Sequence, residues 1–310
     1  MNKDIYISNL AVSFPVSSGL VRALKKTSIA IKKNAITGLI GESGCGKSVL
    51  GMAIMNLLPS NAKISGEVSI NSKNIFNLPV SESRYWRAKT FAIIPQNPEA
   101  AFNPVRKINV QVIEALWSLQ LSQGEITQKM QKIFIDFGLN DFERIWHSYP
   151  FQLSGGMQQK ILCSISIAGQ NDWIVADEPT KGLDHSSLAA LKENLLFTKN
   201  KNNSGMLVIT HDVNLASSLC DTIVVMYAGE IVEIGSNVVQ NPQHPYTKAF
   251  IEALPENGFK YIPGTTPDAL SLNEGCAFAP RCSQYTDRCC KENPPFYDAQ
   301  ISSVRCFLYD

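Results

Sequence analysis

The stretch Gly41–Ser48, which reads GESGCGKS, most constrains what this chain can fold into. It fits the pattern G-x-x-x-x-G-K-S, which carries meaning when a strand precedes it and a helix follows. Residues 35–41 form a short apolar run that predicts a buried strand, and residues 48–59 show a helical pattern. The sequence therefore predicts a phosphate-binding loop in an α/β fold. The alternative is a glycine-rich turn with a chance Lys-Ser pair.

The residue types of this loop suit phosphate chemistry. Glycines let successive backbone N–H groups point at phosphate oxygens, and the helix N-terminus adds the positive end of its dipole. Lys47 is placed to reach the outer phosphates, and the Ser48 hydroxyl to ligate Mg²⁺. Because helix N-termini lower thiol pKa values, we expect Cys45 to be open to oxidation or alkylation. The residues expected to contact nucleotide are Gly41, Ser43, Gly44, Cys45, Gly46, Lys47, Ser48 and Val49.

Two carboxylates end the apolar run WIVADE, residues 173–178, at a predicted strand tip. Asp177 suits a second contact to Mg²⁺, and Glu178 is placed to polarise an attacking water as general base. The alternative is a solvated acidic loop after a strand. Together with the phosphate loop, the pair favours hydrolysis of a nucleoside triphosphate.

A second glycine-rich helix start is LSGGMQQK, Leu153–Lys160. A Ser-Gly-Gly turn that opens a helix is also an anion-binding device. One nucleotide has a single terminal phosphate, and Lys47 already serves it. We therefore expect Ser154, Gly155 and Gly156 to contact a nucleotide that a different subunit holds.

Strand and helix patterns alternate along much of the chain, which predicts a mostly parallel sheet with flanking helices. Residues 108–170 are mostly helical in pattern and look like an insertion into that core. Residues beyond Asn257 are rich in Pro, Gly and polar side chains and are interpreted as a linker. Further strands are predicted over 5–14, 27–33, 66–71, 90–96, 172–177, 205–210, 221–229 and 230–235, with helices from His185 and Asn214.

Composition and charge limit the class of protein. The chain has 310 residues, 45% of them hydrophobic, and a formal net charge of +1. A sizeable core is expected, and a nucleic-acid partner is not. The N-terminus MNKDIYISNL lacks the apolar region of a signal peptide, and no apolar run approaches the ~18 residues of a membrane span. We expect a cytoplasmic protein.

With these motifs in order, the chain resembles the ATP-binding subunits of ABC transporters over residues 4 to about 255. Gly41–Ser48 matches the Walker A loop, LSGGM the family signature, and Asp177 with Glu178 the Walker B pair. Four single residues match further family positions: Phe14 the aromatic that stacks on adenine, Gln96 the Q-loop, Asp184 the D-loop and His211 the switch histidine.

The resemblance implies a fold and a mechanism. The fold is an α/β, RecA-like P-loop core with a parallel sheet, an antiparallel β subdomain and a helical insertion at about 97–170. It would occupy residues 1–256, with a Cys-rich tail over 257–310. Two subunits would pair head to tail, with ATP between one Walker A loop and the other subunit's signature turn. Glu178 and His211 would position water at the γ-phosphate. Gln96 would touch Mg²⁺ or water and link the site to the insertion, which receives the membrane subunit.

The element NPQHPYTKAF, residues 241–250, resembles the segment that follows the ATPase core in peptide and nickel importers. This implies a second, related ATPase subunit, two membrane permeases and an extracytoplasmic binding protein. It also implies a peripheral place on the cytoplasmic face of the inner membrane. We expect di- or oligopeptides as cargo, with nickel or a chelated metal as the alternative. An exporter ATPase and a soluble, non-transport ABC ATPase are the more remote alternatives.

Five of the eight cysteines lie between residues 276 and 306. Cys276, Cys282, Cys289 and Cys306 give the spacing C-x5-C-x6-C-x16-C, similar to that of importer ATPases of which some carry an iron–sulfur cluster. The resemblance implies a 4Fe–4S site that holds together a tail of low apolar content. Zinc, free thiols and redox disulfides stay open, as does Cys290 in place of Cys289. Of the three other cysteines, Cys45 lies in the phosphate loop, and Cys163 and Cys220 are predicted core residues.

Overall fold

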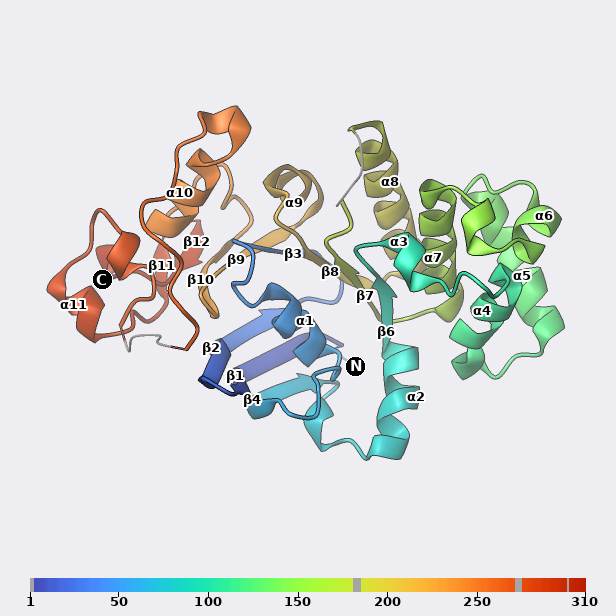
Figure 1. The fold of residues 1–310 in the computed structure, drawn as a ribbon, viewed down its shortest axis with the longest axis horizontal. Coiled ribbons are helices and arrows are strands. Elements are labelled where there is room, and N and C mark those ends of the chain that lie inside the picture. Colours follow the sequence, from blue (N-terminus) through green and yellow to red (C-terminus); the bar gives the residue numbers. More distant parts are fainter. Residues whose placement is uncertain (1–2, 181–184, 271–274, 300) are drawn as a thin grey trace. The chain divides into compact units, whose positions relative to one another are not determined.

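The computed structural model describes residues 3–180, 185–270, 275–299 and 301–310 (Figure 1). Asp184, the expected D-loop residue, lies outside them. The chain forms two compact units, one of Met1–Asn77 with Ile209–Asp310 and one of Leu78–Val208. The Cys-rich tail thus belongs to the same unit as the phosphate loop.

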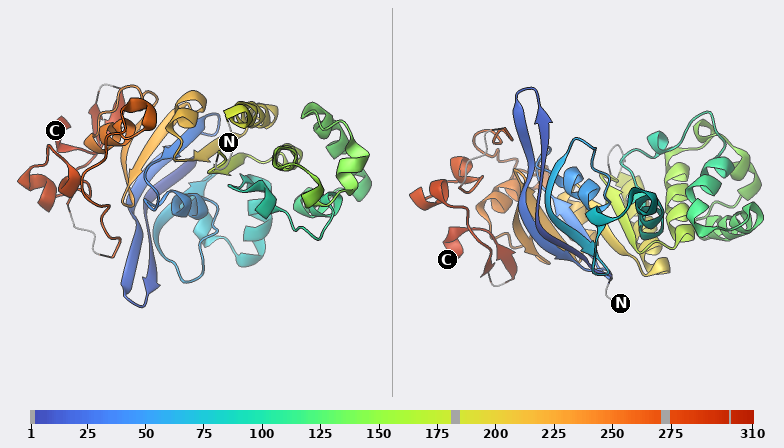
Figure 2. Two further views of the ribbon diagram at one scale, coloured as in Figure 1. Left: turned by 45° about the horizontal axis from the view of Figure 1, so that its top comes forward. Right: turned by 90° about the horizontal axis from the view of Figure 1, so that it is seen from below.

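The first unit contains the predicted antiparallel β subdomain. Its sheet has the order β2-β1-β4-β5. The β1–β2 hairpin is long because pairing continues to Val16 and Gly19, so the second strand begins well before the predicted Thr27. Figure 2 shows this dark blue ribbon extending beyond the rest of its sheet in both views. The strands are β1 (Ile5–Val16), β2 (Gly19–Ile31), β4 (Lys63–Ile70) and β5 (Lys73–Asn74).

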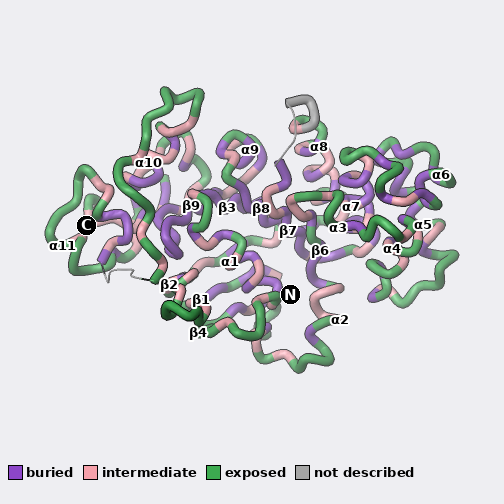
Figure 3. The backbone as a smooth tube through the Cα atoms, viewed as in Figure 1, coloured by how far each residue is buried: buried purple, intermediate pink, exposed green. Residues whose placement is uncertain are grey.

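A second sheet of this unit carries the phosphate loop. The strands of this sheet that lie wholly within the first unit have the order β11-β12-β10-β9-β3. Strand β3 pairs in parallel with β9, whereas β9–β10 and β10–β12 are antiparallel. All five residues of β3 are buried, as a strand covered on both faces requires, and β3 and β9 appear purple in Figure 3. The elements are β3 (Ile36–Ile40), α1 (Lys47–Ile54), α9 (Val213–Leu219), β9 (Thr222–Tyr227), β10 (Glu230–Gly235) and α10 (Pro245–Glu252).

The C-terminal tail is anchored by its own contacts. Strands β11 (Tyr297–Ala299) and β12 (Ser302–Val304) form a hairpin, and β12 pairs with β10. The Phe278 side chain is 3% exposed and packs edge-on against Tyr227 and Tyr246. The sequence pattern missed this hairpin. The hairpin and this aromatic contact both anchor the tail within the first unit. The short helix α11 (Asp287–Lys291) lies between these parts.

The second unit contains the predicted helical region. The Phe134, Phe142 and Trp146 rings meet in its core, each 5% exposed or less. Strands β6 and β7 pair in parallel, with Phe91 opposite Trp173. Its elements are α2 (Val80–Thr90), β6 (Phe91–Ile94), α3 (Pro98–Ala101), α4 (Ile108–Ala115), α5 (Gln123–Asp136), α6 (Phe142–His147), α7 (Gly155–Gly169), β7 (Trp173–Asp177), α8 (His185–Asn202) and β8 (Gly205–Ile209), whose last residue falls in the first unit.

The architecture confirms the predicted α/β class, with a parallel core, an antiparallel sheet and a helical region. Within the described ranges, no helix combines the length and apolar character that crossing a bilayer requires.

Candidate nucleotide-binding site

The phosphate loop leaves β3 and enters α1 through three glycines with positive φ: Gly41 at 149°, Gly44 at 79° and Gly46 at 105°. A Cβ atom on Gly41 would lie 2.2 Å from the Met226 carbonyl oxygen, so packing against β9 also excludes a side chain there. Around Gly44 nothing lies within 4 Å of such an atom. The loop is therefore tight where it leaves the sheet and open at its tip, where a ligand can approach the backbone.

Lys47 begins α1 and is 6% exposed. Its Nζ donates to the carbonyl oxygens of Gly41 at 2.8 Å and Glu42 at 3.0 Å. The Lys47 ammonium thus connects the end of the loop to its first two residues. Ser43 and Ser48 are exposed, and Val49 is half-buried. The Ser48 side chain, in the first turn of α1, is accessible to solvent, and its role as a Mg²⁺ ligand stays a prediction.

Cys45 contradicts one expectation from the sequence. Its side chain is 1% exposed, and burial raises the pKa of the thiol, with Lys47 opposing that shift. The thiolate is the reactive form of cysteine. Here burial, which raises the thiol pKa, outweighs the lowering of the pKa expected from the helix N-terminus. The prediction that Cys45 is an open site for oxidation or alkylation was wrong. Cys163 is fully buried as predicted, and Cys220 is half-buried against the core.

The predicted switch histidine shares a cavity with the phosphate loop. The cavity has a volume of about 470 Å³ and lies within the first unit. His211, exposed after β8, contributes to its wall together with Gly41 and Ser43. The other lining residues are Glu42, Phe250, Ala253, Leu254, Ile262 and Arg281. The fold therefore brings His211 to the loop from about 170 residues away in the chain.

The Walker B and Q-loop residues are in the second unit. Asp177 is the last residue of β7 and Glu178 follows it, both half-buried. Glu178 has a φ of 46°, a left-handed conformation that costs a non-glycine residue roughly 1–2 kcal/mol. Strain of this kind concentrates at functional sites, which supports a special role for this carboxylate. Gln96 is half-buried just after β6.

The signature turn is an exposed helix start. Ser154 is the N-cap of α7, and its hydroxyl accepts a hydrogen bond from the Met157 N–H at 3.3 Å. Gly155 and Gly156 are exposed, and a Cβ atom on Gly156 would meet nothing within 4 Å. The turn thus leaves space over the helix N-terminus. Phe14, the expected adenine contact, is half-buried on β1 opposite Val21.

The sequence pattern did not assign site roles to Glu42, Tyr246 or Arg281. Tyr246 lies in the HPYT element, where His244 caps α10 by accepting from the Tyr246 N–H at 3.0 Å. The Tyr246 hydroxyl accepts a hydrogen bond from the Glu42 N–H at 2.9 Å. The buried Glu233 carboxylate accepts from the His244 N–H, which fixes the start of the helix. The HPYT motif is therefore the sequence feature from which this contact to the phosphate loop could have been predicted.

Comparison with known proteins agrees with this geometry. A glycine-rich loop between a parallel strand and a helix, with a lysine at its end, defines a P-loop nucleotide-binding protein. Residues 24–181 match the ABC transporter family, and residues 232–289 match the family described as oligopeptide/dipeptide transporter, C-terminal region. The chain belongs to the ABC transporter ATP-binding family and is an ATP-hydrolysing enzyme.

Similar proteins cover nearly the whole chain. The probable D,D-dipeptide transport ATP-binding protein DdpD of Escherichia coli (strain K12) is 36% identical, over 93% of this chain and 90% of that protein. The dipeptide transport ATP-binding protein DppD of Bacillus subtilis (strain 168) is 34% identical, over 100% and 96%. The oligopeptide transport ATP-binding protein OppD of Haemophilus influenzae is 32% identical, over 93% and 92%.

Solved structures share the fold. CbiO1 from Clostridium perfringens, described as part of an ABC transporter complex, superposes with a TM-score of 0.65 at 21% identity, over 77% of this chain and 90% of that one. A bacterial ABC transporter cassette solved as a dimer gives a TM-score of 0.63 at 24% identity, over 73% and 96%.

Proposed function

We propose that this chain is the ATP-hydrolysing subunit of a binding-protein-dependent importer for di- and oligopeptides. One observation carries the cargo class: the segment after the ATPase core, residues 232–289, matches the C-terminal region of oligopeptide and dipeptide transporters. The names of the similar proteins, which match 93% to 100% of the chain, support the same class. An ATPase subunit does not touch cargo, so the catalytic residues carry no information on it.

The catalytic roles are assigned to this chain's own residues. The loop N–H groups and Lys47 bind the phosphates, and Phe14 stacks on adenine. Glu178 accepts a proton from the attacking water, while His211 and Gln96 orient that water. Mg²⁺ would enter with ATP and supply neutralisation of the triphosphate charge. The exposed Ser48 hydroxyl and the Asp177 carboxylate are of the donor type that Mg²⁺ prefers and are the side chains proposed to hold it.

Two surfaces suit the partners that such a transporter needs. The exposed turn of Ser154, Gly155 and Gly156 would contact ATP held by a second ATPase subunit. Asp184, which lies outside the described residues, is also proposed to contact nucleotide. In the second unit a cavity of about 470 Å³ includes residues of β6, α4 and α7. Val105 and Phe151, exposed by 78% and 72%, add apolar surface to this unit. We propose that the second unit binds one of two membrane permeases through this surface. Such binding would place the chain peripherally at the cytoplasmic face of the membrane.

We also propose a 4Fe–4S cluster in the tail. A cavity of about 190 Å³ is lined by Cys276, Cys282, Cys289 and Cys306, whereas Cys290 is exposed and does not line it. Burial raises the pKa of Cys276 to about 11 and raises the pKa values of Cys282 and Cys306. Four thiols that line one cavity supply the type and number of donors that such a cluster takes. Across the described parts of the chain, however, no group of three or more His, Cys, Asp or Glu is arranged to hold a metal ion.

The cluster is tested on full-length protein purified without oxygen. We expect iron and acid-labile sulfide in wild type, their loss in Cys289→Ser and their retention in the matched control Cys290→Ser. Zinc without sulfide, or equal loss in both variants, would contradict the assignment.

The transport function is tested by uptake in cells that lack this gene. Labelled di- and oligopeptides are supplied in one arm and labelled nickel in the other, and wild type or Lys47→Ala is returned in parallel. We expect peptide uptake with wild type alone. Nickel uptake instead would move the protein to the alternative cargo, and peptide uptake with Lys47→Ala would contradict the role of the phosphate loop.

A further inference from the structure

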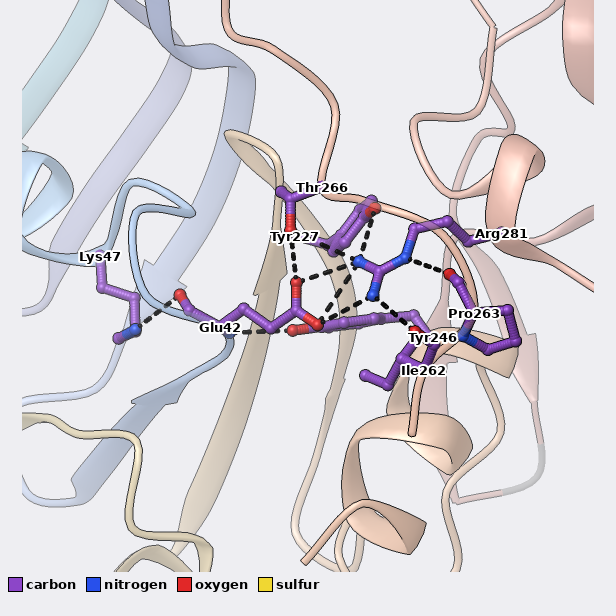
Figure 4. Close-up of polar contacts among 8 residues, drawn as sticks. All are labelled: Glu42, Lys47, Tyr227, Tyr246, Ile262, Pro263, Thr266 and Arg281. Carbon is purple, nitrogen blue, oxygen red and sulfur yellow. Dashed lines mark hydrogen bonds and ion pairs between the residues drawn. The ribbon is translucent and has the colours of Figure 1, made fainter. Parts of the chain in front are cut away.

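The second residue of the phosphate loop, Glu42, is held by the C-terminal part of the chain. Arg281, in a short 3-10 turn of the tail, forms an ion pair with the Glu42 carboxylate at 3.1 Å, and its second terminal nitrogen lies 3.4 Å from the other carboxylate oxygen. The Thr266 hydroxyl donates to the same carboxylate at 3.0 Å. Figure 4 shows these groups converging on Glu42 opposite Lys47.

Arg281 is itself fixed in place. Its Nε donates to the Pro263 carbonyl oxygen at 2.8 Å, and a terminal nitrogen donates to the Tyr227 hydroxyl at 3.2 Å. The Arg281 side chain is 6% exposed and that of Glu42 is 20% exposed. Because the guanidinium is already ordered and shielded from water, its pairing with Glu42 costs little extra side-chain entropy. Pro263 and Thr266, both in the segment interpreted from the sequence as a linker, thus contact Arg281 and its partner Glu42.

The position of Glu42 matters for the ammonium that binds phosphate. Lys47 Nζ donates to the Glu42 carbonyl, and the Glu42 N–H donates to Tyr246, so this one residue is held at its backbone and at its side chain. Without Arg281 the Glu42 carboxylate would lose its ion-pair partner beside a loop that receives a triphosphate. A like charge at that place opposes the binding of an anion.

We propose that Arg281 is a positioning residue of the ATP site, which acts through Glu42 to hold the loop and to neutralise a carboxylate beside it. The C-terminal region thereby sets the affinity of the chain for ATP. This inference rests on the phosphate-binding role proposed for Lys47.

The test is the dissociation constant of full-length protein for a fluorescent ATP analogue with Mg²⁺. We expect Arg281→Gln to raise the Kd by about tenfold, equivalent to about 1.4 kcal/mol. Arg281→Lys, which keeps the charge, should recover part of the loss. Arg288→Gln is the matched control, since Arg288 is 47% exposed and pairs within the tail with Glu292 and Asp310. In steady-state hydrolysis the KM for ATP should rise with little change in kcat.

A double-mutant cycle separates positioning from general destabilisation. Glu42→Gln removes the carboxylate that Arg281 neutralises, so Glu42→Gln/Arg281→Gln should bind ATP more tightly than Arg281→Gln alone. Additive losses, or an unchanged Kd in Arg281→Gln, would overturn the inference.

Two further variants keep the result interpretable. If Arg281→Gln does not fold, Thr266→Val removes one hydrogen bond from the same carboxylate. It should raise the Kd by a smaller factor, and no change would overturn the inference. Lys47→Ala should abolish binding. Normal binding there would refute the proposed site itself, whereas loss there with normal Arg281→Gln would refute only the role of Arg281.

Discussion

Replacing Gly41 with alanine should destabilise the protein before any nucleotide is involved. The backbone conformation of Gly41, with φ of 149°, costs a side-chain-bearing residue about 1–3 kcal/mol. The added Cβ would also lie 2.2 Å from the Met226 carbonyl oxygen and 3.0 Å from the Cys45 sulfur. Overpacking of this kind costs about 1–3 kcal/mol. Since the overlapping atom is backbone in β9, the two terms together predict a loss of roughly 2–6 kcal/mol.

Gly44→Ala in the same loop is the matched control. Its φ of 79° carries a backbone cost of about 1–2 kcal/mol, but a Cβ atom there meets nothing within 4 Å. Urea unfolding of the full-length chain in EDTA, followed by far-UV circular dichroism, measures both. Tryptophan fluorescence is less suitable because all four tryptophans lie in the second unit. A Gly41→Ala midpoint equal to or above that of Gly44→Ala would refute the packing argument.

Three further predictions concern single side chains. Burial lowers the pKa of His244 to about 3 from 6.5, so the unfolded chain binds a proton that the folded chain does not. Stability should therefore fall by up to about 1.4 kcal/mol per pH unit below pH ~6.5, and urea unfolding of His244→Asn should show a flatter pH dependence. Iodoacetamide should label Cys45 far more slowly than the exposed Cys290 at neutral pH, and equal rates by mass spectrometry would contradict the burial of Cys45. Glu178→Gln should bind ATP, hydrolyse it very slowly and accumulate as a dimer, whereas normal turnover would exclude Glu178 as the general base.

The sequence by itself determined the features that depend on neighbours along the chain. The glycines of the phosphate loop, the lysine that follows and the buried strand before them form one continuous segment, so their types and spacing specify both the turn and its chemistry. The helix start at Ser154 is equally local, since a serine followed by two glycines supplies its own N-cap. The predicted α/β class follows from strand and helix periodicity in the same way.

Only the tertiary structure decided what holds the loop. Glu42 and Arg281 are 239 residues apart, and neither lies in a periodic pattern that points to the other. Strands β11 and β12 have three residues each, too few for a period to register, and pairing with β10 stabilises them. The packing around the loop likewise buries Cys45 and raises its pKa, whereas the helix N-terminus, which the sequence does show, predicts a lower pKa. Contacts between distant segments form only when the whole chain is folded. They therefore cannot be predicted from the pattern of neighbouring residues.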